Sequence, residues 1–256
     1  MYVRILGAHN LESQGLKFTS LLIDDALAIE AGSLTSSLSF QAQQKLKAIL
    51  LTHQHYDHIR DIPAIGMSFW LHGNTIDVYT TQPVYDAIMS HLLNDRLYPD
   101  FTQRPAEKPA IQFKVIQPDE PVKVEGYTVL AVPMNHSVPA VGYQITSADG
   151  KTLFYSSDTG PGLAECWQKI SPELLIIEVT APNKYEEFAH HSGHFTPALL
   201  QRELESFRRL KGYLPQIVLV HMNPLQQKII EAEIAEVADK LKTGIRPGRE
   251  GMRIRL

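Results

Sequence analysis

Short apolar runs alternate with polar turns along most of the chain. Residues 47–52, 174–179 and 217–220 are almost continuously apolar, a pattern typical of strands buried on both faces. Elsewhere, brief apolar or alternating stretches lie between turn-forming residues, and Gly126 and the pair Asp149-Gly150 mark hairpin turns. Further strands are therefore predicted at 2–7, 18–24, 26–30, 111–117, 122–125, 127–132, 140–146, 152–156 and 252–255.

Helices are predicted at 36–46, 82–93, 162–170, 197–211 and 225–241. The helix at 197–211 follows Thr196-Pro197, where the threonine can cap the helix and the proline fits its first turn. Thr81-Gln82-Pro83 marks the start of the helix at 82–93 in the same way. Residues 95–110 carry three prolines and no periodicity, so we expect a loop there.

The order of these elements indicates the architecture. Strands come first, helices follow, and strands and helices then come again. Two such halves predict two sheets packed face to face with helices on the outside, an α/β sandwich. No linker-like segment divides the 256 residues, so we expect a single domain over 1–256.

The composition is that of a soluble globular protein, with 44% apolar and 20% charged residues. A formal net charge of −4 argues against a large nucleic-acid interface, which usually carries a basic excess. No run approaches the roughly 20 apolar residues of a membrane span, and the N-terminal apolar run is too short for a signal peptide. We therefore predict a cytoplasmic protein with no membrane partner.

Cys166 is the one cysteine of the chain. A lone thiol cannot form an internal disulfide, so we predict that Cys166 is a small buried apolar residue. The assembly is not encoded in any visible pattern, and a homodimer is expected only because dimers are the commonest oligomers.

Histidine points to chemistry, because several of the 11 histidines lie in tight groups. Residues 53–58 read HQHYDH and directly follow a predicted buried strand, which places His53, His55, Asp57 and His58 close together. Imidazole and carboxylate are good zinc ligands. Four ligands this close cannot all face one ion, but alternating ligands in a turn can bind two adjacent ions that activate water for hydrolysis.

Three remote residues extend this candidate site. His136, Asp158 and His221 each follow a predicted strand. Taken singly, each is equally well explained as a capping or core polar residue. Together with the cluster they favour a metal site at one edge of the sheets, because all four segments begin at the carboxyl ends of strands.

The motif HxHxDH, followed by a strand-end histidine, a strand-end aspartate in a serine-rich turn and a late strand-end histidine, resembles the metallo-β-lactamase superfamily over essentially the whole chain. The resemblance implies a four-layer αββα sandwich of the metallo-β-lactamase fold. It also implies two divalent metal ions, with zinc expected and manganese or iron as alternatives. The implied ligands are His53, His55 and His136 for the first ion, Asp57, His58 and His221 for the second, and Asp158 as the bridge.

One early motif departs from the superfamily pattern. Members often carry Asp-x-Gly after the second or third strand, whereas residues 30–32 read EAG here. Glu30 is expected to replace the aspartate and to anchor the loop below the metals.

Other motifs resemble the phosphodiesterase branch of the superfamily, which includes the tRNA 3′-processing endonuclease tRNase Z. These motifs lie at 136–143 (HSVPAVGY), 157–161 (SDTGP), 175–180 (LIIEVT) and 194–196 (HFT). The resemblance implies that His194 contacts the phosphate or donates a proton, with Glu178 as its partner.

The stretch between His136 and Asp158 has room for only a hairpin, so the tRNA-gripping arm of tRNase Z is not expected. The chain is more similar to the compact class II cyclic-nucleotide phosphodiesterases, whose motif usually has leucine at the position of Tyr56. The expected partner is therefore a small phosphodiester substrate and not a large nucleic acid.

The resulting hypothesis is a phosphodiesterase that acts on a small or cyclic nucleotide-type phosphodiester through a metal-bridging hydroxide. Its candidate catalytic residues are Asp57, His194 and Glu178. Asp57 holds the second ion and can receive the proton of the nucleophile, while His194, oriented by Glu178, protonates the leaving oxygen. Tyr98 and Phe101 of the 95–110 loop are expected to flank the substrate.

Two alternatives stay open. The same metals can polarise a carbonyl, as in a lactonase, a thioesterase or a β-lactamase. The fold can also serve a non-catalytic nucleotide-binding protein. A panel of phosphodiester, lactone and thioester substrates separates these functions.

The other histidines and a basic cluster are given no catalytic role. His9 and His72 lack evident partners and are predicted to be structural, and His91, His190 and His191 are predicted to lie at the surface. The only basic cluster is expected to be a solvated face, with phosphate contact as the alternative; it comprises Arg246, Arg249, Arg253 and Arg255.

Overall fold

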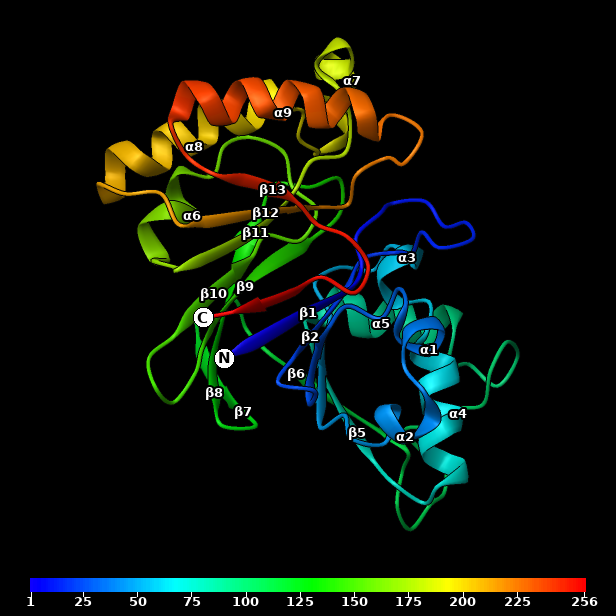
Figure 1. The fold of residues 1–256 in the computed structure, drawn as a ribbon. Helices are drawn as coiled ribbons and strands as arrows, with labels where there is room; N and C mark the ends of the chain where they lie inside the picture. The colour runs from blue at the N-terminus through cyan, green and yellow to red at the C-terminus, as the bar shows by residue number, and fades with distance from the viewer.

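Two seven-stranded mixed sheets form the centre of the fold in the computed structural model, which describes residues 1–256 (Figure 1). The first sheet has the strand order β14 (Arg253–Arg255), β1 (Tyr2–Gly7), β2 (Ser20–Ile23), β3 (Leu27–Ile29), β4 (Ala48–Leu50), β5 (Ile76–Thr80), β6 (Ile111–Val115). The second has the order β13 (Ile245–Pro247), β12 (Gln216–Val220), β11 (Leu174–Glu178), β10 (Thr152–Tyr155), β9 (Ala140–Thr146), β8 (Tyr127–Met134), β7 (Pro121–Val124). Neighbours from β3 to β6 and from β10 to β13 pair in parallel.

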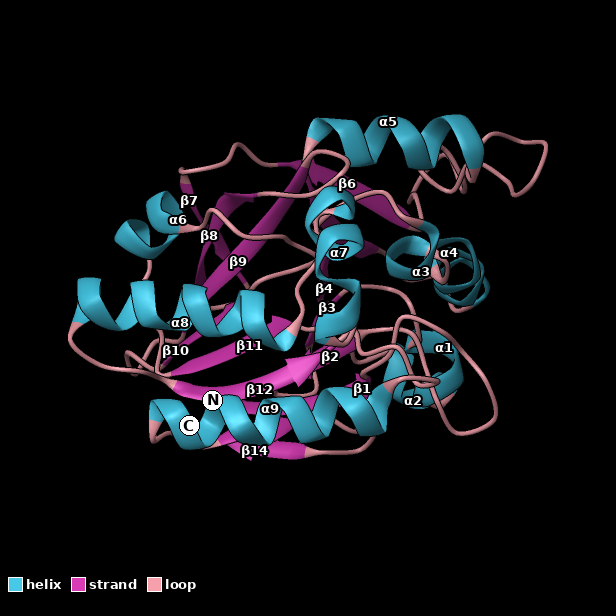
Figure 2. Cartoon of the chain, turned by 90° about the horizontal axis from the view of Figure 1, so that it is seen from above, coloured by secondary structure: helices cyan, strands magenta, loops and turns pink.

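Helices cover the outer face of each sheet (Figure 2). The helices on the side of the first sheet are α1 (Leu34–Ser37), α2 (Phe40–Gln43), α3 (Tyr56–Ile59), α4 (Ile62–Leu71) and α5 (Gln82–His91). Those on the side of the second sheet are α6 (Ala164–Lys169), α7 (Glu186–Ser192), α8 (Pro197–Lys211) and α9 (Gln227–Leu241), and the 3₁₀ turn η1 (Asn183–Tyr185) leads into α7. None of these helices combines the length and the apolar character that a membrane crossing requires.

Three apolar layers hold these four layers of secondary structure together. The middle layer contains 24 buried residues drawn from both sheets, and each outer layer contains 22 residues from one sheet and the helices that cover it. Layers of such similar size mean that each sheet is buried on both faces, which confirms the αββα sandwich. Cys166 lies in the outer layer of the second sheet, as predicted, and burial raises the pKa of its thiol to about 12.

The helices show where the sequence pattern is informative and where it is not. Helix α8 has the predicted bounds, because Thr196 accepts a hydrogen bond from the Leu199 amide and Gly212 ends the helix in the left-handed region. The predicted helix at 36–46 is wrong, since two short helices, α1 and α2, occupy that segment. Helix α4 escapes prediction because it is apolar on nearly all sides and has no polar face to reveal a helical period.

The proline-rich segment 95–110 lies away from the metal-ligand candidates. The backbone amide of Ile76, at the start of β5, bonds to the carbonyl of Ala110, so the segment leads into the amino end of the parallel strand β6. Phe101 is fully buried and packs beside Trp70, with ring centroids 5.9 Å apart. The prediction that Tyr98 and Phe101 flank the substrate is therefore wrong, because the loop sits at the opposite end of the strands and Phe101 is a core residue.

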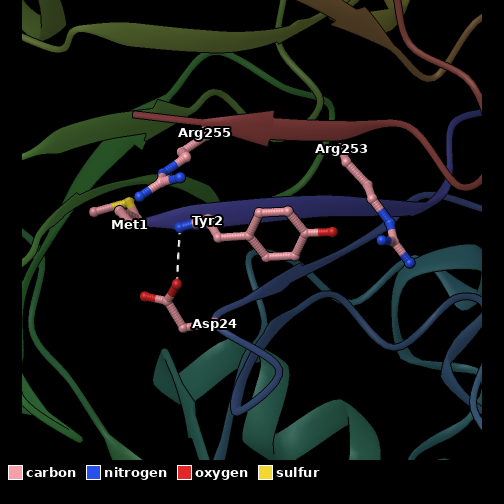
Figure 3. Close-up of a pocket in the computed structure, with 5 residues that line it drawn as sticks. All are labelled: Met1, Tyr2, Asp24, Arg253 and Arg255. Atoms are coloured by element: carbon pink, nitrogen blue, oxygen red, sulfur yellow. Dashed lines mark hydrogen bonds between the residues drawn. The ribbon is translucent and has the colours of Figure 1, made fainter.

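Two arginines of the basic cluster, Arg253 and Arg255, lie away from the candidate site. Arg253 and Arg255 project beside Tyr2, and with Met1 and Asp24 they line a shallow pocket (Figure 3). Tyr2 pairs with Arg255 at the amino end of β1, whereas the opposite end of β1 leads to His9. These arginines form the solvated face that the sequence predicts.

His9 joins three remote parts of the chain. Its buried ring places Nδ1 2.8 Å from Glu250 Oε1 and Nε2 3.1 Å from Gln227 Oε1. The expectation that His9 lacks partners is wrong, because both partners lie more than 200 residues away in sequence. Burial alone would lower the pKa of His9, but the Glu250 carboxylate raises it above its ordinary value, and the same contact lowers the pKa of Glu250 against the effect of burial.

Replacing Glu250 with glutamine is expected to lower the free energy of unfolding by about 1–3 kcal/mol, because a buried imidazole loses its charged partner. The raised pKa of His9 stabilises the fold below about pH 6.5 and this contribution is lost as the pH rises, while the lowered pKa of Glu250 contributes above about pH 4.5. Urea unfolding should therefore show a larger loss at pH 5.5 than at pH 9. Glu236→Gln on the exposed face of α9 is the control, and an equal loss at both pH values would contradict the ion pair.

Candidate metal centre

Four segments that follow strands bring polar side chains to one edge of the two sheets. The HQHYDH segment follows β4, while His136 follows β8, Asp158 follows β10 and His221 follows β12. Because β10, β11 and β12 are parallel, Asp158, Glu178 at the end of β11 and His221 emerge at the same edge. The Tyr143 hydroxyl of β9 donates to the carbonyl of Leu51 at 2.7 Å, which ties the second sheet to the end of β4.

The first group of ligand candidates contains three histidines and one aspartate. The ring nitrogen Nδ1 of His55 lies 3.2 Å from Nε2 of His53 and 3.2 Å from Nε2 of His136. One nitrogen of each ring and one oxygen of Asp158 all lie within 4.8 Å of one another. The residues implied for the first ion therefore converge on one point.

The second group shares the carboxylate of Asp158 with the first. Asp57 Oδ2 lies 3.4 Å from His58 Nε2 and 3.3 Å from His221 Nε2. Asp158 Oδ2 lies 3.4 Å and 3.2 Å from these same two nitrogens and 3.8 Å from His53 Nε2. This carboxylate thus stands between the two groups, in the position expected of a bridge.

Hydrogen bonds behind the rings determine which nitrogen faces the site. The Gly193 carbonyl can only accept, so His136 donates from Nδ1 at 2.9 Å and keeps a lone pair on Nε2. Thr180 donates its hydroxyl proton to Glu178 Oε2 and so accepts from His221 Nδ1 at 2.8 Å. Thr52 donates to Glu30 and lies 3.0 Å from His53 Nδ1. In all three histidines Nε2 faces the site, where it can bind a metal ion when it carries no proton.

The backbone is turned sharply at three points of this edge. Glu30, Ser157 and His221 have φ values of 64°, 60° and 61°, in the left-handed region that costs a side-chain-bearing residue about 1–3 kcal/mol. Gly32 lies so close to the Asp57 carbonyl that a Cβ atom there would approach it to 2.1 Å. Such conformations persist because the surrounding contacts fix them, and they position the ligand candidates closely.

His194 and Glu178 form a pair at the border of the site. His194 Nδ1 lies 2.8 Å from Glu178 Oε1, and the His194 ring stacks on His221 with centroids 5.5 Å apart. Burial alone would lower the pKa of His194, but the Glu178 carboxylate outweighs it and raises the pKa to about 9. At neutral pH this ring is therefore an imidazolium whose Nε2 proton is available to a bound molecule.

A profile of the β-lactamase superfamily domain matches residues 21–222, which is most of the chain. The chain belongs to the metallo-β-lactamase superfamily. The match contains the HQHYDH segment, His136, Asp158, Glu178, His194 and His221.

Several curated proteins are similar to the chain at low identity. An octanoyltransferase of Porphyromonas gingivalis is 28% identical over 75% of this chain and 36% of its own length. A ribonuclease Z of Acaryochloris marina is 35% identical over 41% of this chain and 32% of its own length, so the chain spans about a third of each of these proteins. The probable metallo-hydrolase YflN of Bacillus subtilis is 24% identical over 94% of this chain and 89% of YflN.

Two solved structures share the fold over the full chain. Yeast PDE1 gives a TM-score of 0.84 at 15% identity and covers 100% of this chain and 99% of its own. The short form of human tRNase Z gives a TM-score of 0.70 at 18% identity, with coverage of 100% and 99%. The match to the superfamily domain, with YflN as a relative, places the chain among the metallo-hydrolases of the superfamily, which implies bound divalent metal ions.

The donor groups fit divalent ions. Asp158 Oδ1 is buried without a hydrogen-bond partner, and neither ring nitrogen of His58 makes a well-formed hydrogen bond, although Nδ1 lies 3.1 Å from Glu30 Oε1. Burial opposes ionisation of Asp57 and Asp158, yet the neighbouring His58 and His221 hold the pKa of both carboxyls below the ordinary range. Buried carboxylates of this kind need a cation beside them, which metal ions of the superfamily would supply.

Some residues of this metallo-β-lactamase site carry no sequence signal of their own. Thr180 contacts Glu178, His194 and His221, and Ser157 donates to Thr52 at 2.7 Å. Both lie within the motifs at 157–161 and 175–180, but a threonine or serine after a strand is too common for a role to be assigned to it from sequence. The remaining surface histidines are exposed and lie outside the site; they are His72, His91, His190 and His191.

Proposed function

We propose that the chain is a phosphodiesterase that hydrolyses a small or cyclic nucleotide-type phosphodiester with two divalent ions, of which zinc fits the donors best. The observation that carries this proposal is the His194–Glu178 pair beside two ligand groups that share Asp158. An imidazolium at the border of a metal site suits an anionic substrate and can protonate an alkoxide leaving group. The relatives named ribonuclease Z support the same bond type.

The first ligand group and the second would hold one ion each, with Asp158 between them. When bound, the ions would supply Lewis-acid polarisation of the phosphoryl group and a water of lowered pKa. The side chains then have separate tasks. Asp57 has 24% of its side chain exposed, so a proton that it accepts from the nucleophile can pass on to solvent.

His194 performs the acid step. Glu178 Oε1 also accepts from the Phe195 amide at 3.2 Å, so the carboxylate is fixed by backbone as well as by the ring. The proton on His194 Nε2 then points away from Glu178 and can pass to the departing oxygen. A small substrate is favoured because the segment between His136 and Asp158 consists of the β9–β10 hairpin, with no arm to grip a longer nucleic acid.

A substrate panel on the purified full chain tests this function. We expect turnover of bis-p-nitrophenyl phosphate and 3′,5′-cyclic AMP, loss of that turnover after chelation, and recovery when zinc or manganese is restored. A lactone and a thioester are the comparison substrates. Cleavage of either with both phosphodiesters untouched would contradict the phosphodiesterase and favour a carbonyl hydrolase.

A further inference from the structure

A cleft of about 630 Å³ begins at His194 and Thr180 and extends away from the ligand groups. It runs beneath η1 and α7, the helix that stands out from the rest of its layer (Figure 1), and reaches the start of α9. The chemistry of the ligand groups does not require this space. A molecule bound in this cleft would therefore be the part of the substrate that is attached to the reacting group.

Two aromatic side chains at the cleft have no role in the core. Tyr185 of η1 is 44% exposed and Phe188 of α7 is 68% exposed, although both are large and apolar. The Lys184 ammonium lies over one face of the Tyr185 ring, 4.8 Å from its centroid, so the other face and the Phe188 ring offer a stacking surface for a planar ring. Neither ring belongs to any of the three buried apolar layers.

Three amide side chains at the same cleft have unused hydrogen-bonding groups. Asn10 Oδ1 and Gln226 Oε1 are shielded from solvent and have no donor partner. Asn223 Oδ1 accepts from the Leu225 amide at 3.0 Å, which leaves its NH₂ group free to donate. Buried acceptors are nearly always paired in native proteins, and a molecule with N–H donors in the cleft could pair with these oxygens. A small rotation of either amide would present its oxygen or its NH₂ group to the cleft.

The lining also argues against a second phosphate. Apart from His194, the residues of the cleft carry no charge. A neutral, planar ring with donors and acceptors on its edge matches the aromatic faces and the amides together, whereas an alkyl ester would leave the amides unpaired.

We infer that this cleft binds a nucleobase-type nitrogen heterocycle carried on the leaving-group side of the substrate. We place the heterocycle on the leaving-group side because the cleft begins at His194. The leaving group, which receives the His194 proton, must lie next to this residue. The inference rests on the proposed phosphodiesterase for its place in the reaction, but the binding of the heterocycle does not depend on turnover.

The test compares the wild-type chain with the double variant Tyr185→Ala/Phe188→Ala. Calorimetry with adenosine, guanosine, cytidine and uridine, which carry no phosphate, should detect binding of at least one nucleoside. The double variant should weaken that binding by about 10–100-fold, the range for loss of base stacking. Leu225→Ala, which removes an exposed side chain beside the cleft without lining it, is the matched control and should leave the Kd unchanged.

Kinetics give the second readout. The ratio of kcat/KM for 3′,5′-cyclic AMP to that for methyl p-nitrophenyl phosphate, which has no base, should fall about 10–100-fold in the double variant, mainly through KM. An unchanged ratio, or a wild-type chain that binds none of the four nucleosides, would overturn the inference. A chain that binds a nucleoside in this way but cleaves neither phosphodiester would support the cleft and overturn the proposed function instead.

Discussion

Replacing His194 with alanine is expected to slow the hydrolysis of alkyl phosphodiesters by about 10²–10⁴-fold, the range typical for loss of a general acid. His194 Nδ1 is engaged by Glu178 at 2.8 Å, so the proton on Nε2 is the one available to a departing oxygen. An alkoxide departs poorly without that proton, whereas p-nitrophenolate departs readily without it. The measurement is kcat on methyl and p-nitrophenyl phosphodiesters, and the loss should be much smaller for the p-nitrophenyl ester.

His190→Ala provides the control for this substitution, because His190 is an exposed histidine of the neighbouring helix α7. It should leave both rates within about twofold of the wild type. Glu178→Gln should show the same dependence on leaving group as His194→Ala, with a smaller loss, because the amide can still orient the ring. Equal losses on the two esters in His194→Ala would mean that His194 positions the substrate and does not supply the proton.

Replacing Asp158 with asparagine is expected to lower kcat/KM on every phosphodiester by about 10³-fold or more, since binding of the ions is worth several kcal/mol in the transition state. The Asp158 carboxylate lies close to nitrogens of both ligand groups. Asparagine keeps the shape of the side chain but removes the charge that balances two cations. Steady-state kinetics on bis-p-nitrophenyl phosphate measure the loss, which should not depend on the leaving group.

Two further variants make this result interpretable. Asp149→Asn changes the exposed tip of the β9–β10 hairpin and should leave the rate unchanged. His55→Ala removes a half-buried ligand candidate whose loss is less disruptive to the core, and it should also lower the rate strongly. If Asp158→Asn retained turnover within tenfold of the wild type while folded, Asp158 would not connect the two groups.

The ligand candidates could be predicted from sequence because each follows an apolar strand, and parallel strands end at the same edge of a sheet. His53, His136, Asp158 and His221 converge for this reason. The residue types also indicated the chemistry, because three histidines and an aspartate within six residues are typical of a metal-binding segment. Their roles as ligands are predictions that the geometry supports.

Features that depend on distant partners could not be predicted in this way. His9 is paired with Gln227 and Glu250, and Thr180 connects Glu178 to His194 and His221, so neither contact leaves a local pattern. Phe101 lies in a polar, proline-rich segment, where only the fold reveals that its ring is part of the core. The division of the chain into one domain remains a prediction.

The stacking surface at Tyr185 and Phe188 escaped sequence analysis for a related reason. Exposed aromatic residues are common, and they indicate a binding site only when a cleft and unpaired amides lie beside them. The aromatic and amide residues of this cleft come from η1 and α7, the loop after β1 and the start of α9. These three parts of the chain lie far apart in sequence.

Metal analysis of the purified full chain tests the central claim most directly. The two ligand groups predict about two divalent ions per chain in the wild type, and clearly fewer in Asp158→Asn, measured by inductively coupled plasma mass spectrometry alongside phosphodiester turnover. A wild-type chain that turns over its substrate with no stoichiometric metal, and keeps that rate in the presence of a strong chelator, would contradict the account.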